Sequence, residues 1–208
     1  MKRLNLDLEL SDLYKDIQNM EPIYERFNDN FFWTWANWQS LFTIQKMGKE
    51  TLDSTFYALR VKNYKKYKLG EQRVSDLYEL NKMKLKSGDF CFYCYNEIPK
   101  EELTADHIFP RSKGGSNDLN NIIFVCKHCN SSKGKKELLK WFMLDKNELP
   151  SPYVLGHYYR QIYQYAMENG LMTKSFAEVE SMKLPFDPRS ILLTHTHRGK
   201  LWYLYYWT

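Results

Sequence analysis

The sequence lacks any apolar run of the roughly 18–20 residues that a membrane-spanning helix requires. Its first residues are interrupted by charges and lack the apolar stretch of a secretory signal. Cysteine is scarce, with four residues in a chain of 208, and the sequence contains no internal repeat or low-complexity tract. We therefore expect a cytoplasmic globular protein with no membrane association, in which reduced thiols bind metal rather than form disulfides.

The net charge of the chain is also small. The chain has 30 basic and 25 acidic residues, a net charge of +5, which permits nucleic-acid binding without requiring it. The length suffices for one compact domain or two small ones. Aromatic residues, at 16%, are plentiful. Composition thus indicates a globular protein and selects no function.

The cysteines carry the first specific signal. They form two Cys-x-x-Cys pairs, Cys91 with Cys94 and Cys126 with Cys129. This spacing lets both thiolates of a tight turn bind one tetrahedral metal, so the sequence predicts a structural zinc site with four cysteine ligands. His128 lies inside the second pair and could replace a cysteine, although the paired spacing favours Cys129.

The 31 residues between the pairs, 95–125, exceed the roughly 15–20 of a plain zinc ribbon. This insert and the residues just after the second pair contain, in order, Asp106, His107, Pro110, Gly114, Gly115, Asn121, Asn130 and Lys133. A structural zinc needs no polar insert of this kind. We therefore expect the zinc to hold together a second site.

In this order and spacing, the residues resemble the HNH endonuclease family over about 88–143. The resemblance implies a β-hairpin and a helix that grip one catalytic metal and hydrolyse phosphodiester bonds. The expected fold class is α+β: a zinc-stapled ββα-metal core flanked by N-terminal helices and a C-terminal helical and β segment.

The resemblance also implies roles for single residues. His107 would be the general base, Asp106 and Asn130 the catalytic-metal ligands, and Asn121 would hold the hairpin loop so that His107 points at the phosphate. An imidazole, with an ordinary pKa near 6.5, can accept a proton from water at neutral pH. Oxygen ligands suit Mg²⁺ or Mn²⁺. Asn130 stands where many family members have histidine, which leaves the preferred metal open.

Basic residues surround this candidate site. We expect them to hold the nucleic acid that is cut, DNA in the leading hypothesis. They are Arg111, Lys113, Lys133, Lys135 and Lys136.

The remaining chain divides into expected regions: a helical 1–86, the nuclease core with its zinc site over 87–145, and a C-terminal 146–208. Apolar periodicity predicts helices over 8–20, 71–86, 130–142, 153–168 and 174–182. Strands are predicted over 103–109 and 122–125, and a terminal hairpin over 191–208. Lysines interleaved with tyrosines over 51–69 would form either a solvated helix face or a surface that binds phosphates and bases.

Two other functions fit the sequence. The protein could be a non-catalytic, zinc-dependent nucleic-acid-binding module, in which Asn121 and Asn130 only cap turns or helices. It could instead be a nuclease subunit that is active only within a larger, defence-type complex. The aromatic segments 33–38 and 202–207 motivate this second alternative, since they could bind a protein partner or another copy of the chain. Segment 33–38 is also dense enough in aromatics to be core.

Overall fold

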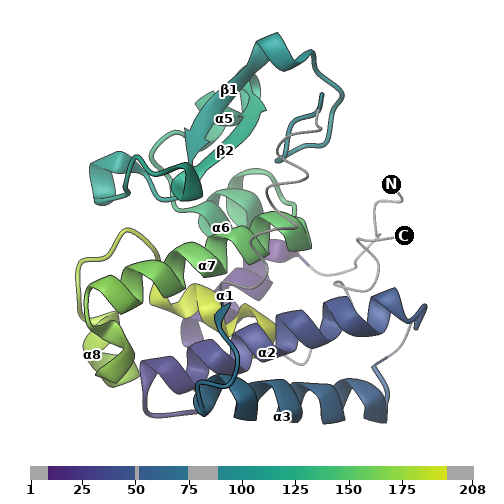
Figure 1. Ribbon diagram of the computed structural model, residues 1–208. Coiled ribbons are helices and arrows are strands. Elements are labelled where there is room, and N and C mark those ends of the chain that lie inside the picture. Colours follow the sequence, from purple (N-terminus) through teal and green to yellow (C-terminus); the bar gives the residue numbers. More distant parts are fainter. Residues whose placement is uncertain (1–8, 50–51, 75–88, 196–208) are drawn as a thin grey trace. The chain divides into compact units, whose positions relative to one another are not determined.

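The computed structural model describes residues 9–49, 52–74 and 89–195, which form two compact units (Figure 1). The helical unit contains the described parts of 1–74, 163–182 and 188–208, and the hairpin unit those of 75–162 and 183–187. These units differ from the expected regions, because the C-terminal region 146–208 is divided between them. Helix α7, Pro152–Glu168, begins in the hairpin unit and ends in the helical unit.

The helical unit is built around α2, whose neighbour α3 runs alongside it (Figure 1). Its helices are α1 (Leu10–Asn19), α2 (Phe27–Lys46), α3 (Ser54–Lys68) and α8 (Phe176–Glu180), with 3₁₀ turns at Leu171–Thr173 and Pro188–His195. The helices predicted over 8–20 and 174–182 are confirmed by α1 and α8. Asp53 begins α3 by accepting hydrogen bonds from the backbone N–H groups of Thr55 and Phe56.

The aromatic residues of α2 form the core of this unit. Phe31, Trp35 and Trp38 are buried, and the Trp35 ring stacks on both of the others, with centroids 6.4 and 5.0 Å away. The interpretation of 33–38 as core is therefore confirmed for its buried members. A helix of this kind is stabilised mainly by burial of its aromatic area rather than by intrinsic helix propensity.

Helix α3 separates its basic residues from its aromatic ones. Lys62 and Lys65 are exposed, whereas Tyr67 is buried and Tyr64 stacks on Tyr24 with ring centroids 5.5 Å apart. Tyrosines engaged in this packing cannot also stack on exposed bases. Tyr64 and Tyr67 therefore do not form the base-binding surface considered over 51–69, and Lys62 and Lys65 lie on a solvated helix face.

Two predicted elements fall wholly or partly outside the described residues, namely the helix over 71–86 and the terminal hairpin with the aromatic segment 202–207. The prediction of a strand at the start of that hairpin, over 191–195, is wrong, because Pro188–His195 is a 3₁₀ helix. Three consecutive residues there, Ile191, Leu192 and Leu193, are all buried. A strand would instead turn alternate side chains to opposite faces.

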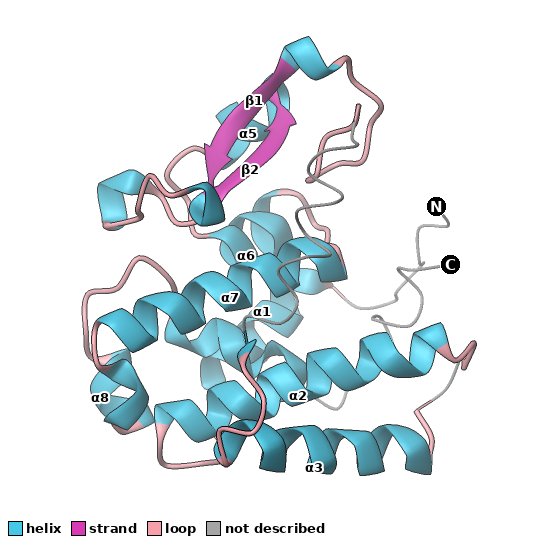
Figure 2. Cartoon of the chain, in the orientation of Figure 1, coloured by secondary structure: helices cyan, strands magenta, loops and turns pink. Residues whose placement is uncertain are grey.

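The hairpin unit contains the only sheet found in the described ranges, an antiparallel pair of β1 (Leu103–His107) and β2 (Ile122–Cys126) (Figure 2). Three helices follow: α5 (Lys127–Lys133), α6 (Leu138–Lys140), which continues as a π-helical turn over Trp141–Asp145, and α7. The expected α+β class is confirmed. The helix predicted over 153–168 is confirmed by α7.

The single helix predicted over 130–142 is wrong. Helix α5 begins earlier, at Lys127, because the Cys126 sulfur accepts a hydrogen bond from the Cys129 backbone N–H and so caps the first turn. It ends at Gly134, whose φ of 51° and ψ of −123° lie outside the helical region. Helix α6 starts separately, with the Glu137 carboxylate accepting from the Lys140 backbone N–H at 2.8 Å.

No helix within the described residues is both long enough and apolar enough to cross a membrane.

Candidate functional site

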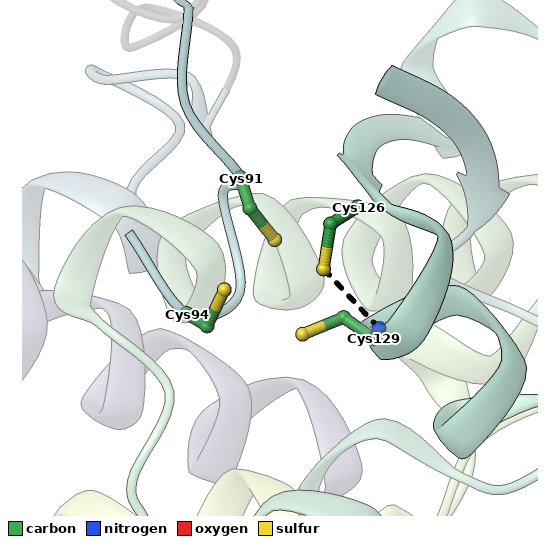
Figure 3. A group of neighbouring side chains, drawn as sticks. All are labelled: Cys91, Cys94, Cys126 and Cys129. Carbon is green, nitrogen blue, oxygen red and sulfur yellow. Dashed lines mark hydrogen bonds between the residues drawn. The ribbon is translucent and has the colours of Figure 1, made fainter. Parts of the chain in front are cut away.

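The four cysteines converge on one point (Figure 3). Their sulfur atoms all lie within 4.8 Å of one another. Tetrahedral Zn–S bonds of about 2.3 Å would place sulfurs about 3.8 Å apart, so a small closure completes a zinc site. Cys129 belongs to this cluster, whereas His128 is exposed. The fourth candidate ligand is therefore the cysteine, and the predicted ligand set is the set that the structure brings together.

Backbone amides prepare the sulfurs to bind a cation. The Cys129 N–H donates to the Cys126 sulfur at 3.3 Å, and the Tyr93 N–H donates to the Cys91 sulfur at 3.4 Å. A hydrogen bond from the Cys129 thiol, assisted by backbone N–H groups, lowers the pKa of Cys91. The same thiol contact raises the pKa of Cys129, and burial raises that of Cys94, so without a metal the four sulfurs share protons, whereas zinc binds the thiolate form.

The hairpin separates the cysteine cluster from the predicted catalytic end. Leu103 pairs with the zinc-ligand candidate Cys126 at one end of the ladder, and His107 pairs with Ile122 at the other. Four residue steps at roughly 3.3 Å place these ends about 13 Å apart along the strand. The cysteine cluster and His107 therefore lie near opposite ends of one hairpin.

Asp106 is buried in a polar network behind the hairpin. Its Oδ2 accepts hydrogen bonds from the Tyr93 hydroxyl at 2.8 Å and the Lys133 ammonium at 2.8 Å. The same ammonium donates to the His107 carbonyl oxygen at 2.7 Å. Burial, followed by the Asp106 charge, raises the pKa of Tyr93 well above its ordinary value, so the phenol stays a donor. Burial lowers the pKa of Lys133, and the Asp106 carboxylate opposes that shift.

Asn130 reaches the same strand from α5. Its amide nitrogen donates to the Thr104 hydroxyl at 3.0 Å and to the Ala105 carbonyl at 3.2 Å. Three residues separate it from Lys133, so both side chains lie on the helix face that meets β1. Within the described part of the chain, the second oxygens of Asp106 and Asn130, Oδ1 in each case, have no hydrogen-bond partner.

His107 ends β1 and is half-buried. Its Nε2 lies 3.1 Å from the side-chain oxygen of Asn117, a residue of the loop that joins the two strands. Because an amide oxygen can only accept, Nε2 is the donor in this contact. No sequence pattern pointed to Asn117, which is one of several polar residues in that loop.

Asn121 fastens the connecting loop to the end of β1. Its side-chain oxygen accepts from the Phe109 N–H at 2.8 Å, and its amide nitrogen donates to the carbonyls of Phe109 at 3.0 Å and Ser116 at 2.8 Å. Gly115 makes this closure possible, because a Cβ there would lie 1.9 Å from the Phe109 carbonyl oxygen. The loop-holding contacts expected of Asn121 are present, and their effect on His107 stays a prediction.

Helix α7 supports the same loop. His157 is buried, and its Nε2 hydrogen-bonds the Asn120 carbonyl at 2.5 Å. Burial lowers the pKa of His157 to about 4, so the ring is neutral and can donate only through Nε2. Neither His157 nor the Tyr93 contact to Asp106 was found from the sequence, since both depend on chain segments that meet only in the fold.

The predicted basic residues differ in their exposure to solvent. Arg111, Lys113 and Lys135 are exposed, and so is Lys136, which pairs with Asp145 at 3.0 Å. The expectation that Lys133 contacts nucleic acid does not fit the structure. Its ammonium is fully buried against Asp106, where a phosphate cannot reach it without displacing the carboxylate.

This part of the chain is similar to known proteins. Residues 91–140 match the model of a family described as HNH endonuclease. The resemblance expected from the sequence is thereby confirmed over this segment, in which four cysteines are positioned to bind a metal.

Two curated relatives match part of the chain. The CRISPR-associated endonuclease Cas9 of Corynebacterium diphtheriae is 38% identical over 52 residues, which are 24% of this chain and 5% of that protein. The CRISPR-associated endonuclease Cas9 of Actinomyces naeslundii is 34% identical over 67 residues, 32% of this chain and 6% of the relative. The chain therefore spans only a small part of the length of these relatives. No solved structure matches it significantly.

A structural zinc contributes its binding free energy directly to folding. Cys126→Ser should therefore lose the bound zinc and unfold the hairpin unit, as measured by metal analysis of the purified protein and by thermal unfolding. His128→Ala, in the same turn but exposed, should keep both the metal and the stability. Unchanged zinc content in Cys126→Ser would contradict the four-cysteine site.

Substitution of Asn121 tests the loop contacts, because its side chain both accepts and donates hydrogen bonds. Asn121→Ala leaves Phe109 and Ser116 groups without partners, at a cost of about 1–3 kcal/mol in unfolding free energy. Asn121→Asp should cost at least as much, because a carboxylate would face two carbonyl oxygens. Urea denaturation measures both. Asn96→Ala, at an exposed position, is the control, and equal stability of all three variants would rule out the loop-holding contacts.

Removing the buried cation should destabilise the hairpin unit. Lys133→Met leaves the Asp106 carboxylate buried without its counter-charge, which costs about 3–5 kcal/mol. The double variant Lys133→Met, Asp106→Leu should recover much of this loss, because both charges are then removed. Lys135→Met is the exposed control. If chemical denaturation gave the same stability for Lys133→Met and Lys135→Met, the buried pair would not exist as described.

Proposed function

We propose that this protein is a metal-dependent endonuclease that hydrolyses phosphodiester bonds in DNA. The observation that carries the proposal is the placement of Asp106 and His107 at consecutive positions of β1, with Asn130 of α5 hydrogen-bonded to the two residues before Asp106. The match of residues 91–140 to the HNH endonuclease family supports it.

His107 would act as the general base. With the proton held on Nε2 by the Asn117 oxygen, Nδ1 is the atom that accepts a proton from the attacking water. Asn117 is then a positioning residue that fixes the tautomer. Asn121 and Gly115 would keep the loop that carries Asn117 close to the end of β1.

Asp106 and Asn130 would hold the catalytic metal, Mg²⁺ or Mn²⁺, through their second oxygens. Carboxylate and amide oxygens are the ligand types that these ions prefer. When bound, such an ion stabilises negative charge on the scissile phosphate and the leaving oxygen. Tyr93 and Lys133 would orient the Asp106 carboxylate, since both donate to its other oxygen.

A nucleic acid is the proposed substrate class because the relatives are endonucleases and because exposed basic residues flank the site, and within that class we propose DNA. Arg111 and Lys113 lie on the loop between the strands, and Lys135 follows α5. Each can contact a phosphate without losing an internal partner in the described structure. Lys136 would first have to leave Asp145, an exposed pair of the kind that contributes little to stability.

A plasmid-nicking assay with Mg²⁺, Mn²⁺ and chelator tests the proposal. His107→Ala should lower the cleavage rate about 10²–10⁴-fold with zinc content and folding unchanged. Asn117→Ala should lower it less, and Asn117→Asp should retain cleavage because a carboxylate also accepts from Nε2. Full activity of His107→Ala would overturn the assignment.

The same assay separates the two alternative functions. Binding of DNA with no nicking in any divalent metal would favour a non-catalytic zinc module. Inactivity of the isolated chain, with nicking restored by a co-purifying protein, would favour a subunit of a larger complex.

A further inference from the structure

The helical unit contains a cavity of about 210 Å³ between α2, α3 and the 3₁₀ helix Pro188–His195. Aromatic side chains, including Trp33 and Phe56, form much of its wall, and Arg60, Thr194 and His195 supply polar groups. Tyr57 also lines it and is partly exposed at 38%. No residue of the candidate nuclease site contributes to this cavity.

Arg60 brings an uncompensated positive charge to the cavity. Its guanidinium carbon lies 4.4 Å from the centre of the Trp33 ring, 5.1 Å from that of Tyr57 and 5.6 Å from that of Phe56. Within the described ranges no carboxylate forms an ion pair with it, and its buried Nε has no hydrogen-bond partner. Burial lowers the pKa of Arg60, because the charged guanidinium is less favourable when it is partly removed from water.

His195 supplies an acceptor beside that cation. The Thr34 hydroxyl donates its proton to the Ile191 carbonyl at 2.5 Å, so at 2.8 Å from His195 Nε2 it can only accept. The imidazole proton is therefore on Nε2, and the lone pair is on Nδ1. Burial, opposed by a hydrogen bond with the Asn30 backbone and assisted by the Arg60 charge, lowers the pKa of His195 to about 3, so the ring is neutral.

Two of these polar atoms are buried without partners in the part of the chain that the structure describes. They are His195 Nδ1 and the Thr194 hydroxyl oxygen, and both residues line the cavity. A buried polar atom left unpaired costs about 1–3 kcal/mol. The Thr194 hydroxyl and the Arg60 guanidinium are unpaired donors at this cavity, and a small anion between them would satisfy both.

The size of the cavity limits the ligand. An apolar cavity of about 150 Å³ binds benzene, whereas drug-sized ligands occupy pockets of about 300 Å³ or more. A volume of about 210 Å³ therefore fits one ring with one small substituent. We propose that this cavity binds a small aromatic anion, with its carboxylate or phosphate on Arg60 and its ring against Trp33 and Phe56.

Calorimetry on the full chain tests the site with four probes. Benzoate and phenyl phosphate carry the ring and an anion and distinguish carboxylate from phosphate. Benzamidine has the shape of benzoate with a positive charge, and inorganic phosphate has the charge without the ring. The expected result is saturable binding of benzoate or phenyl phosphate, binding of inorganic phosphate at least about tenfold weaker, and no binding of benzamidine.

Arg60→Met keeps the apolar stem in contact with the rings and removes the charge. It should weaken binding of the aromatic anion by about tenfold or more, with the helical circular-dichroism signal and the unfolding transition retained. Lys62→Met removes an exposed charge from the same helix and should leave binding unchanged. If both variants lost binding affinity equally, general surface charge would explain the effect and the proposal would be overturned. Absence of binding by either aromatic anion, or binding of benzamidine as tightly as benzoate, would overturn it as well.

Discussion

The convergence of four cysteine sulfurs is the constraint on which the hairpin unit depends. It joins two chain segments separated by 31 residues, 95–125, and each segment brings one group to the same carboxylate. The first turn carries Tyr93, whose hydroxyl reaches Asp106, and the second begins α5, which carries Lys133 to the other side of that carboxylate. Because Cys126 also caps α5, the ligand turn and the helix start are one structure. A zinc ion bound there would fix the position of Asp106 from about 10 Å away along the strand.

The hairpin has a second, metal-independent closure at its far end. Asn121 bonds both backbone groups of Phe109 and the Ser116 carbonyl, and His157 of α7 holds the neighbouring Asn120. The loop that carries Asn117 is thus fixed by an amide on one side and by a helix on the other. This arrangement explains why the first part of α7 groups with the hairpin unit, although its sequence reads as a separate amphipathic helix.

The sequence was sufficient for the parts of the fold that short spacing determines. Two Cys-x-x-Cys pairs predicted the sulfur cluster, and the order of Asp106, His107 and Asn121 predicted the family that residues 91–140 match. Helical periodicity located α1 and α7. These signals are local, so they can be read without knowledge of distant segments.

The errors arose where a distant partner decides the outcome. Lys133 has the sequence context of an exposed phosphate contact, and only the position of Asp106 makes it a buried cation. Gly134 ends α5 inside an apolar pattern that continues across it, because a glycine backbone conformation takes precedence over periodicity. The tyrosines of α3 appeared free to bind bases until Tyr24 was placed against Tyr64. Asn117 and His157 gave no local signal at all.

The charges around Asp106 bear on how the proposed catalytic metal would be held. The carboxylate is already paired with the Lys133 ammonium at 2.8 Å, and Asn130 is neutral, so the protein offers a divalent ion two oxygens but no net negative charge. A site of this kind binds Mg²⁺ or Mn²⁺ weakly by itself, because such ions retain water and prefer added anionic ligands. The phosphate of the nucleic acid is the missing anion. Under the proposed function, metal and substrate would therefore bind cooperatively, and the buried lysine would be what makes the metal site depend on the substrate.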